Sequence, residues 1–294
     1  MGEQVNELNV TANGFTFGGL ASGPAEGRPV VLLHGFPETS WSWRNQLVGL
    51  ADAGYRAVAL DQRGYSSGAR PTDVAAYQID KLVHDVFEVA EALGMADFDL
   101  VGHDWGGMVA WVAAAQYPDL LRSVTVLSTP HPAAFAAALS EPGGEQQNRS
   151  SYISFFRQEG IAENALLGDD NSGEGLKSLF AASGFETDDS KIFVDAMREP
   201  GALTAALNWY RANIGDDMTT GLADTGPVTI PTMYIWSTED IALGREAAEA
   251  TREHVTGPYR FEVLEGVSHW VPEMAPDAVN GLLIDFLGSQ PARN

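Results

Sequence analysis

The sequence predicts an α/β protein with a mostly parallel sheet flanked by helices and one inserted helical segment. Three observations support this prediction. Short apolar runs alternate with longer stretches of helical period at both ends of the chain. The interval 132–228 breaks that alternation, and one apolar run enters a helix through a glycine-rich turn at residues 102–107.

Most of the expected strands lie before the insertion. An Asn13-Gly14 pair is a favourable two-residue turn and predicts an opening hairpin. The expected strands of this half are Leu8–Ala12, Phe15–Leu20, Pro29–Leu33, Arg56–Leu60, Phe98–Val101 and Ser123–Leu127. Helical period predicts helices at Gln78–Leu93 and Met108–Gln116 between them.

The pattern resumes after the insertion with two strands and two helices. These are expected at Thr232–Trp236, Arg245–His254, Arg260–Leu264 and Pro276–Leu287. Residues 1–131 and 229–294 are therefore expected to form one core domain. Residues 132–228 are rich in alanine, glycine and acids and predict a helical cap, or lid, domain, with loops at 141–145 and 168–175.

Length, charge and composition exclude several classes of protein. The chain has 294 residues and no cysteine, which excludes a thiolate nucleophile and cysteine-ligated zinc. Its 40 acidic and 17 basic residues give a net charge of −23, so it lacks the basic surface that nucleic acid or an anionic membrane requires. Residues 1–13 are acidic rather than basic, and no run of about 18 apolar residues follows. We expect a soluble, cytoplasmic protein, and the sequence leaves its oligomeric state open, a homodimer included.

The glycine-rich turn predicts a nucleophile elbow. The run Phe98-Asp99-Leu100-Val101-Gly102-His103-Asp104-Trp105-Gly106-Gly107 leads a strand directly into a helix and places Asp104 at the tip of the turn. A carboxylate, with a usual pKa of about 3.9, is ionised at neutral pH and can attack a saturated carbon without a base. The resulting ester can be hydrolysed, whereas a serine would form an inert ether. Such turns also serve phosphate binding and close packing, so the turn alone leaves these alternatives open.

Hydrolysis of that ester requires a base, an acid that orients it, and oxyanion donors. Asp240 follows the strand at 232–236, and His269 follows the last strand; ligands bind at this edge of open α/β sheets. The order nucleophile, acid, histidine is the order expected with this type of elbow. A lone acid or histidine in a loop is more often a surface residue, but the three together indicate a triad. Phe36, after the strand at 29–33, and Trp105 offer backbone amides for the oxyanion.

Other candidates are assigned structural roles. His34 is interpreted as a turn residue, and His103 is expected to point away from Asp104. Residues 64–68 match a serine elbow with Ser66 at the centre, but Ala-Arg-Pro follows them instead of an apolar helix. Neither a His-Glu-x-x-His motif nor a Gly-x-Gly-x-x-Gly motif after a strand occurs, so no metal or cofactor is implied.

With these residues in place, the chain resembles the epoxide hydrolases of the α/β-hydrolase fold over nearly its whole length. The matching stretches are His34-Gly35-Phe36-Pro37-Glu38, Asp61-Gln62-Arg63-Gly64-Tyr65-Ser66, Gly102-His103-Asp104-Trp105-Gly106-Gly107 and Ser268-His269-Trp270. The resemblance implies the α/β-hydrolase fold and a cis bond between Phe36 and Pro37. It also implies that Tyr152 and Tyr210 of the cap hold the epoxide oxygen as the ring opens, although each alone would equally fit cap packing.

The resemblance further implies a substrate pocket. We expect Glu38 to help position the hydrolytic water there. Trp209, Phe155 and Phe180 of the cap are expected to line the pocket.

The expected function is hydrolysis of a small neutral epoxide to a vicinal diol, with water as the second reactant. A covalent ester on Asp104 would be hydrolysed by water that His269 and Asp240 activate. A haloalkane dehalogenase with the same nucleophile is the alternative, although that family typically has asparagine or another halide donor where this chain has Phe36. Fluoroacetate dehalogenases place arginines beside the nucleophile, which this chain lacks. A non-catalytic ligand receptor on the same fold is a third alternative, but such proteins commonly lose triad residues.

Overall fold

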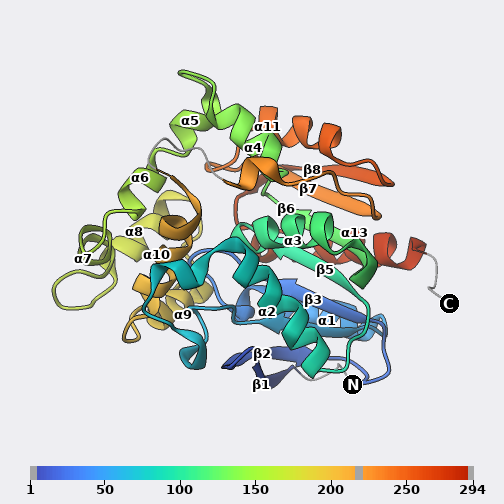
Figure 1. Ribbon diagram of the computed structural model, residues 1–294. Coiled ribbons are helices and arrows are strands. Elements are labelled where there is room, and N and C mark those ends of the chain that lie inside the picture. The colour runs from blue at the N-terminus through green and yellow to red at the C-terminus, as the bar shows by residue number, and fades with distance from the viewer. Residues whose placement is uncertain (1–4, 216–220, 291–294) are drawn as a thin grey trace.

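A single eight-stranded sheet forms the centre of the molecule. The computed structural model describes residues 5–215 and 221–290, and its strand order is β1-β2-β4-β3-β5-β6-β7-β8 (Figure 1). The strands are β1 Asn6–Ala12, β2 Phe15–Ser22, β3 Pro29–Leu33, β4 Arg56–Leu60, β5 Phe98–His103, β6 Leu121–Leu127, β7 Thr232–Glu239 and β8 Tyr259–Ser268. Only the pairs β1–β2 and β2–β4 are antiparallel, and every other neighbouring pair is parallel. The prediction of a mostly parallel sheet is confirmed.

The opening hairpin follows the sequence closely. Asn13 and Gly14 have φ angles of 49° and 78°, and two consecutive positive φ angles are what a tight hairpin turn requires. The strands β3 and β4 have the predicted bounds, whereas β7 and β8 extend three and four residues further, to Glu239 and Ser268. This extension brings the last two strands directly to the residues Asp240 and His269.

Helices cover both faces of the sheet and separate two apolar cores. The helices α1 Arg44–Asp52 and α13 Pro276–Ser289 pack on one face, and α2 Ile79–Ala92 and α3 Trp105–Gln116 on the other (Figure 1). Alternate residues of β3 enter different cores, because successive side chains of a strand point to opposite faces. The remaining core helices are α11 Arg245–Ala250, which a 3₁₀ turn continues to residue 254, and α12 Val271–Met274.

Two helices differ from the expectation. The helix α1 was not predicted, because Gly49 and a run of mixed residues weaken its helical signal. A Cβ at Gly49 would lie 2.6 Å from Nδ2 of Asn280, so the glycine allows α1 to pack closely against α13. The helix α3 begins at Trp105, three residues before the expected start, because the turn leads into it without a linker.

The chain between β6 and β7 is helical, as its composition predicts. Its helices are α4 Pro132–Leu139, α5 Glu145–Arg149, α6 Tyr152–Phe156, α7 Ile161–Leu167, α8 Glu174–Ala182, α9 Asp188–Met197 and α10 Ala202–Asn213. Within the described part of this interval there is no strand, only an isolated bridge from Val228 to Val255. Most of these helices, α5 to α10, gather on one side of the molecule beside the sheet (Figure 1).

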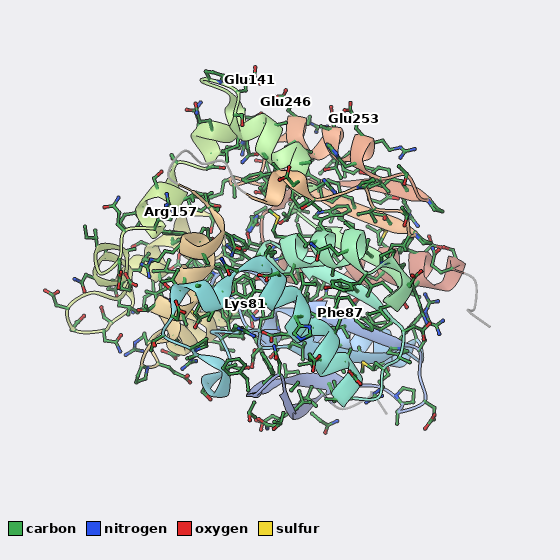
Figure 2. All side chains as sticks on the ribbon, in the orientation of Figure 1. Lys81, Phe87, Glu141, Arg157, Glu246 and Glu253 are labelled. Carbon is green, nitrogen blue, oxygen red and sulfur yellow. The ribbon has the colours of Figure 1, made fainter. Side chains whose placement is uncertain are left out.

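The surface reflects the acidic composition. Figure 2 shows Glu141, Glu246 and Glu253 pointing outward along the edge formed by the segment after α4 and by α11 and its continuation. None of the helices in ranges 5–215 and 221–290 combines the length and the hydropathy that a bilayer-spanning segment needs.

Candidate active site

The turn between β5 and α3 holds Asp104 in an unusual backbone conformation. Asp104 has φ 48° and ψ −120°, a region that non-glycine residues rarely occupy. A Cβ at Gly102 would lie 2.2 Å from the carbonyl oxygen of Gly106, and one at Gly106 would lie 2.2 Å from that of Leu33. Strand and helix therefore approach too closely for side chains at these positions. The turn projects the carboxylate of Asp104 into a cavity.

One oxygen of this carboxylate is bound by the loop after β3. The backbone N–H of Phe36 donates to Oδ1 of Asp104 at 2.8 Å. Gly35 permits this approach, because a Cβ there would lie 2.3 Å from the Cβ of Asp104. Trp105 is the first residue of α3, where a backbone N–H has no acceptor within the helix. The bond between Phe36 and Pro37 is cis, as the resemblance implied.

The other oxygen faces a histidine that an aspartate orients. The pairing of Glu239 with Ser268 in the β7–β8 ladder makes Asp240 and His269 the next residues on adjacent strands. Nδ1 of His269 lies 2.9 Å from Oδ2 of Asp240, and its Nε2 lies 3.6 Å from Oδ2 of Asp104. Oδ1 of Asp240 accepts the N–H groups of residues 242 and 243 at 2.8 and 3.0 Å. Of the three residues expected to form a triad, His269 thus lies between Asp240 and Asp104 and faces both.

The charges of this group fix its protonation. Burial lowers the pKa of His269, but the attraction and hydrogen bond of Asp240 and the nearby charge of Asp104 outweigh burial and raise that pKa well above its usual value. Burial would raise the pKa of Asp240, but the charge and hydrogen bond of His269 and the two backbone donors lower it. At neutral pH, His269 is therefore an imidazolium between two carboxylates.

Two tyrosines from separate helices face the same carboxylate. Tyr152 of α6 and Tyr210 of α10 have ring centroids 6.4 Å apart and meet edge to face. Tyr210 also packs edge-on against Phe36 and Trp105, at 5.4 and 5.1 Å between centroids. Burial raises the pKa of both hydroxyls, with smaller contributions from nearby acidic groups including Asp104. Both tyrosines therefore keep their protons at neutral pH and can donate them in hydrogen bonds.

Asp104 lies between two unequal lobes of the cavity. The larger lobe, of about 360 Å³, is lined mainly by apolar side chains, many of them from the helices between β6 and β7. The smaller lobe, of about 40 Å³, is bordered by Met108, Phe135 and Leu243 among others. The carboxylate and the two tyrosines border both lobes.

Of the four expected pocket residues, one lines the cavity. Phe155 borders the larger lobe. Glu38 does not: it is fully buried outside the cavity, where its Oε2 accepts the N–H of Gly35 at 2.9 Å and lies 3.0 Å from Nδ1 of His103. Glu38 is therefore no lining residue of the cavity, and its expected help in positioning the hydrolytic water stays a prediction.

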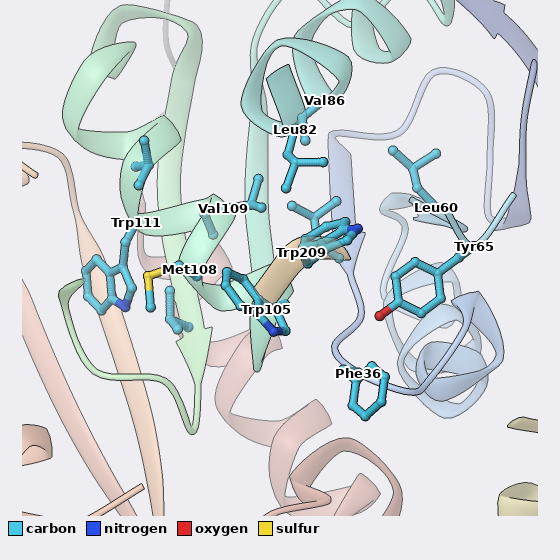
Figure 3. Close-up of a cluster of buried hydrophobic side chains, with 14 of the residues drawn as sticks. Phe36, Leu60, Tyr65, Leu82, Val86, Trp105, Met108, Val109, Trp111 and Trp209 are labelled. Carbon is cyan, nitrogen blue, oxygen red and sulfur yellow. The ribbon is translucent and has the colours of Figure 1, made fainter. Parts of the chain in front are cut away.

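Trp209 and Phe180 also lie outside the cavity, contrary to the expectation. Figure 3 shows the ring of Trp209 against that of Trp105, with Tyr65 beside it; the centroids are 5.8 and 5.9 Å from Trp209. Its Nε1 donates to a backbone carbonyl of the loop after β4 at 2.9 Å. Phe180 packs instead against Trp270, with 5.0 Å between centroids. Both side chains belong to the core because their helices turn other residues toward the cavity.

The residues assigned structural roles are held by backbone groups. Nδ1 of the buried His34 lies 2.8 Å from the carbonyl oxygen of Gly35. Ser66 accepts the N–H of Gly18 at 2.8 Å and donates to a backbone carbonyl at 2.5 Å, so it fastens a loop. The sequence did not reveal that Nε2 of His103 lies 2.9 Å from the carbonyl oxygen of His269. The residue immediately before the nucleophile thus contacts the backbone of the histidine.

One further contact was not expected from the sequence. Arg149 of α5 borders the larger lobe and donates to the backbone carbonyl of Asp240. The helices between β6 and β7 therefore contact the loop of the triad acid directly. Among the residues that the structure describes, no three His, Asp or Glu side chains are grouped so as to hold a metal ion.

Comparison with known proteins gives a consistent result. The family model described as alpha/beta hydrolase fold matches residues 28–276. The chain is 36% identical to the AB hydrolase superfamily protein YfhM of Bacillus subtilis, over 96% of this chain and 97% of that one. It is 35% identical to epoxide hydrolase 4 of Mus musculus, over 98% of this chain and 80% of that protein.

Solved structures show the same likeness. An epoxide hydrolase of the α/β-hydrolase superfamily from metagenomes of hot environments has a TM-score of 0.84 and 32% identity, over 97% of this chain and 99% of that one. The Bacillus megaterium epoxide hydrolase, in complex with an inhibitor, has a TM-score of 0.85 and 28% identity, over 96% of this chain and 100% of that one.

Proposed function

The chain belongs to the epoxide hydrolases of the α/β-hydrolase fold, and from this membership we propose that it converts an epoxide to a vicinal diol through a covalent ester on Asp104. One observation supports the mechanism above all others. A single carboxylate has one oxygen bound by the Phe36 amide, the other facing His269, and two tyrosines along the same cavity. Each of these contacts corresponds to one requirement of the two-step reaction.

The first step is alkylation of Asp104. Oδ1 already accepts the Phe36 N–H, so Oδ2 is the oxygen that attacks a ring carbon. The C–O bond of the ring breaks as the new ester bond forms, and the electron pair moves to the epoxide oxygen. Tyr152 and Tyr210 donate hydrogen bonds to this developing alkoxide and supply its proton. An unaided alkoxide would be a poor leaving group.

The second step is hydrolysis of the ester. His269, oriented by Asp240, takes a proton from water, and the hydroxide attacks the ester carbonyl carbon of Asp104. The negative charge that develops on Oδ1 is stabilised by the N–H groups of Phe36 and Trp105. Collapse of this intermediate breaks the bond between the carbonyl carbon and the alkyl oxygen. The proton that His269 took passes to the alkyl oxygen, and the diol leaves. The proton that entered with the hydroxide then passes from the carboxyl group of Asp104 to His269, and the carboxylate is restored.

The cavity indicates the kind of epoxide. Its larger lobe is lined mainly by apolar side chains such as Phe155 and Phe156, which suits a neutral substituent. The net charge of −23 repels anionic substrates as they approach. We further propose that residues 132–228 act as a cap domain over a core of 1–131 and 229–294, because α6 and α10 supply both tyrosines. Water is the only other reactant, and the chain acts in the cytoplasm.

The test of this function separates the two steps. The variant His269→Gln should form the ester but not hydrolyse it, so intact-protein mass spectrometry after addition of styrene oxide should show a mass increase equal to the epoxide. The double variant with Asp104→Asn is the control and should show no adduct. Diol formation by the wild type is measured beside halide release from a 1-haloalkane. Halide release without diol would indicate a dehalogenase, and stoichiometric binding without product would indicate a receptor.

A further inference from the structure

Three loops of the active site meet at a buried pair of carboxyl groups. Glu38 is fully buried in the turn after β3 that also holds Phe36. Glu273 is 9% exposed and lies on α12, four residues after His269. His103, the last residue of β5, contacts Glu38 from the side of the nucleophile elbow. Neither carboxyl borders the cavity, so neither meets substrate.

Glu38 connects the oxyanion turn with the backbone of the base. Its Oε2 accepts the N–H of Gly35 at 2.9 Å and lies 3.0 Å from Nδ1 of His103. Nε2 of His103 lies 2.9 Å from the carbonyl oxygen of His269 and carries a hydrogen, because a carbonyl only accepts. Ser128 donates to the same carbonyl at 3.2 Å.

Glu273 closes this network from the other side. Its Oε1 accepts the hydroxyl of Ser42 at 2.7 Å. The two remaining oxygens, Oε1 of Glu38 and Oε2 of Glu273, are buried and have no hydrogen-bond partner, although the two carboxyl groups interact with each other. Two carboxyl groups in such contact form a hydrogen bond only when one of them carries a proton.

We propose that Glu38 and Glu273 share one proton at neutral pH, that Glu273 is the protonated partner, and that this pair positions the Phe36 turn and the His269 backbone. The donors decide which residue is ionised. Glu38 faces the Gly35 N–H and His103, whereas Glu273 has only the hydroxyl of Ser42. Hydrogen bonds favour the charged form of the group that receives more of them.

The electrostatics agree with that assignment. Burial and then the charge of Glu38 raise the pKa of Glu273 well above its usual value. Burial would raise the pKa of Glu38, but the charge and hydrogen bond of His103 lower it to about 2. His34 and Tyr65 also interact electrostatically with Glu38. Within the pair, the proton is therefore held on Glu273.

The positioning role rests on the function proposed above. Loss of the shared proton at alkaline pH would leave two carboxylates in contact, and their repulsion would separate the Phe36 turn from α12. The oxyanion donor and His269 would then move apart. Glutamine at position 273 can donate its amide N–H to Glu38 and accept from Ser42, and it has no proton to lose.

Protonation is tested directly by ¹³C NMR of protein labelled at the glutamate carboxyl carbons. One buried glutamate should remain protonated at neutral pH, and its signal should disappear in Glu273→Gln. The absence of a protonated glutamate in the wild type, or its persistence in Glu273→Gln, would overturn the assignment. This readout does not depend on activity, so it decides the inference even if the chain forms no diol.

The positioning role is tested with two substitutions at the same residue. Glu273→Gln should keep kcat for diol formation within about twofold and remove the alkaline fall of the pH profile. Glu273→Leu should lower kcat about 10- to 100-fold, the loss expected when a reacting group is misplaced by about 1 Å. The exposed Glu253→Gln is the control and should change neither. The positioning role is refuted if Glu273→Gln loses as much activity as Glu273→Leu, or if Glu273→Leu keeps the wild-type pH profile. If Glu273→Leu does not fold, the pH profile of Glu273→Gln alone decides whether the role holds.

Discussion

The smaller lobe of the cavity predicts a preference for epoxides substituted on only one ring carbon. Its volume is about 40 Å³, against about 360 Å³ for the larger lobe. An epoxide whose oxygen contacts Tyr152 and Tyr210 while Asp104 faces a ring carbon therefore has room for a large substituent on one side only.

Met108 in the wall of the smaller lobe gives the means to test this limit. Met108→Ala removes three side-chain atoms from this wall, as many non-hydrogen atoms as a propyl group has. Forcing those three atoms into the native lobe costs about 1–3 kcal/mol. That cost corresponds to a discrimination of about 5- to 150-fold in kcat/KM. Met108→Ala should remove most of it.

The assay compares styrene oxide with the trans epoxide that carries a propyl group on the other ring carbon. Diol formation is measured with both substrates, and the ratio of their kcat/KM values is taken for each variant. Met274→Ala is the matched control, because Met274 is 46% exposed and lies outside the cavity. An unchanged ratio in Met108→Ala, or an equal change in Met274→Ala, would refute the reasoning.

Three other outcomes are expected. Tyr210→Phe should slow the alkylation step about 100-fold in single-turnover experiments; an unchanged rate would assign ring opening to other donors. The attraction of Asp240 outweighs burial and raises the pKa of His269. The stability that this pair contributes should therefore be complete below about pH 6.5, the usual pKa of histidine, and should be lost as pH rises through the raised pKa of His269 in the folded protein. Urea unfolding over this range should show that dependence in the wild type and not in His269→Gln. Gly106→Ala should destabilise the protein by about 3 kcal/mol, because its Cβ would lie 2.2 Å from a carbonyl oxygen of β3. Gly281→Ala in α13 should stabilise the protein by about 0.5–1 kcal/mol, because a Cβ there meets nothing within 4 Å. Equal effects of the two variants in thermal unfolding would contradict both predictions.

The sequence predicts positions at strand ends well because local rules determine them. The turn at Asp104 requires glycines that are visible in the chain, and Asp240 and His269 each follow an apolar run. Parallel strands bring their carboxyl ends to one edge, so residues far apart in sequence meet there without any knowledge of side-chain packing. The ladder pairing that makes Asp240 and His269 neighbours is the structural form of this rule.

The sequence does not reveal which face of a cap helix meets the cavity. Successive residues of a helix point about 100° apart, so neighbours face different surroundings. Tyr210 borders the cavity and Trp209 packs in the core, and likewise Leu179 borders the larger lobe while Phe180 does not. An aromatic residue fits either environment. Glu273 was missed for a related reason: its role depends on contact with Glu38, 235 positions earlier in the chain.

Charge also explains why the two proposed steps occur in order. In the free protein, Asp240 and Asp104 together hold the pKa of His269 well above its usual value against the opposing effect of burial, so the imidazole is protonated and is not a base. Alkylation of Asp104 converts a carboxylate at 3.6 Å from Nε2 into a neutral ester. That change removes part of the attraction that stabilises the imidazolium, and burial then favours the neutral imidazole, whose proton passes to the tyrosinate left by ring opening. His269 therefore becomes able to accept a proton from water only after an ester is present for that water to attack.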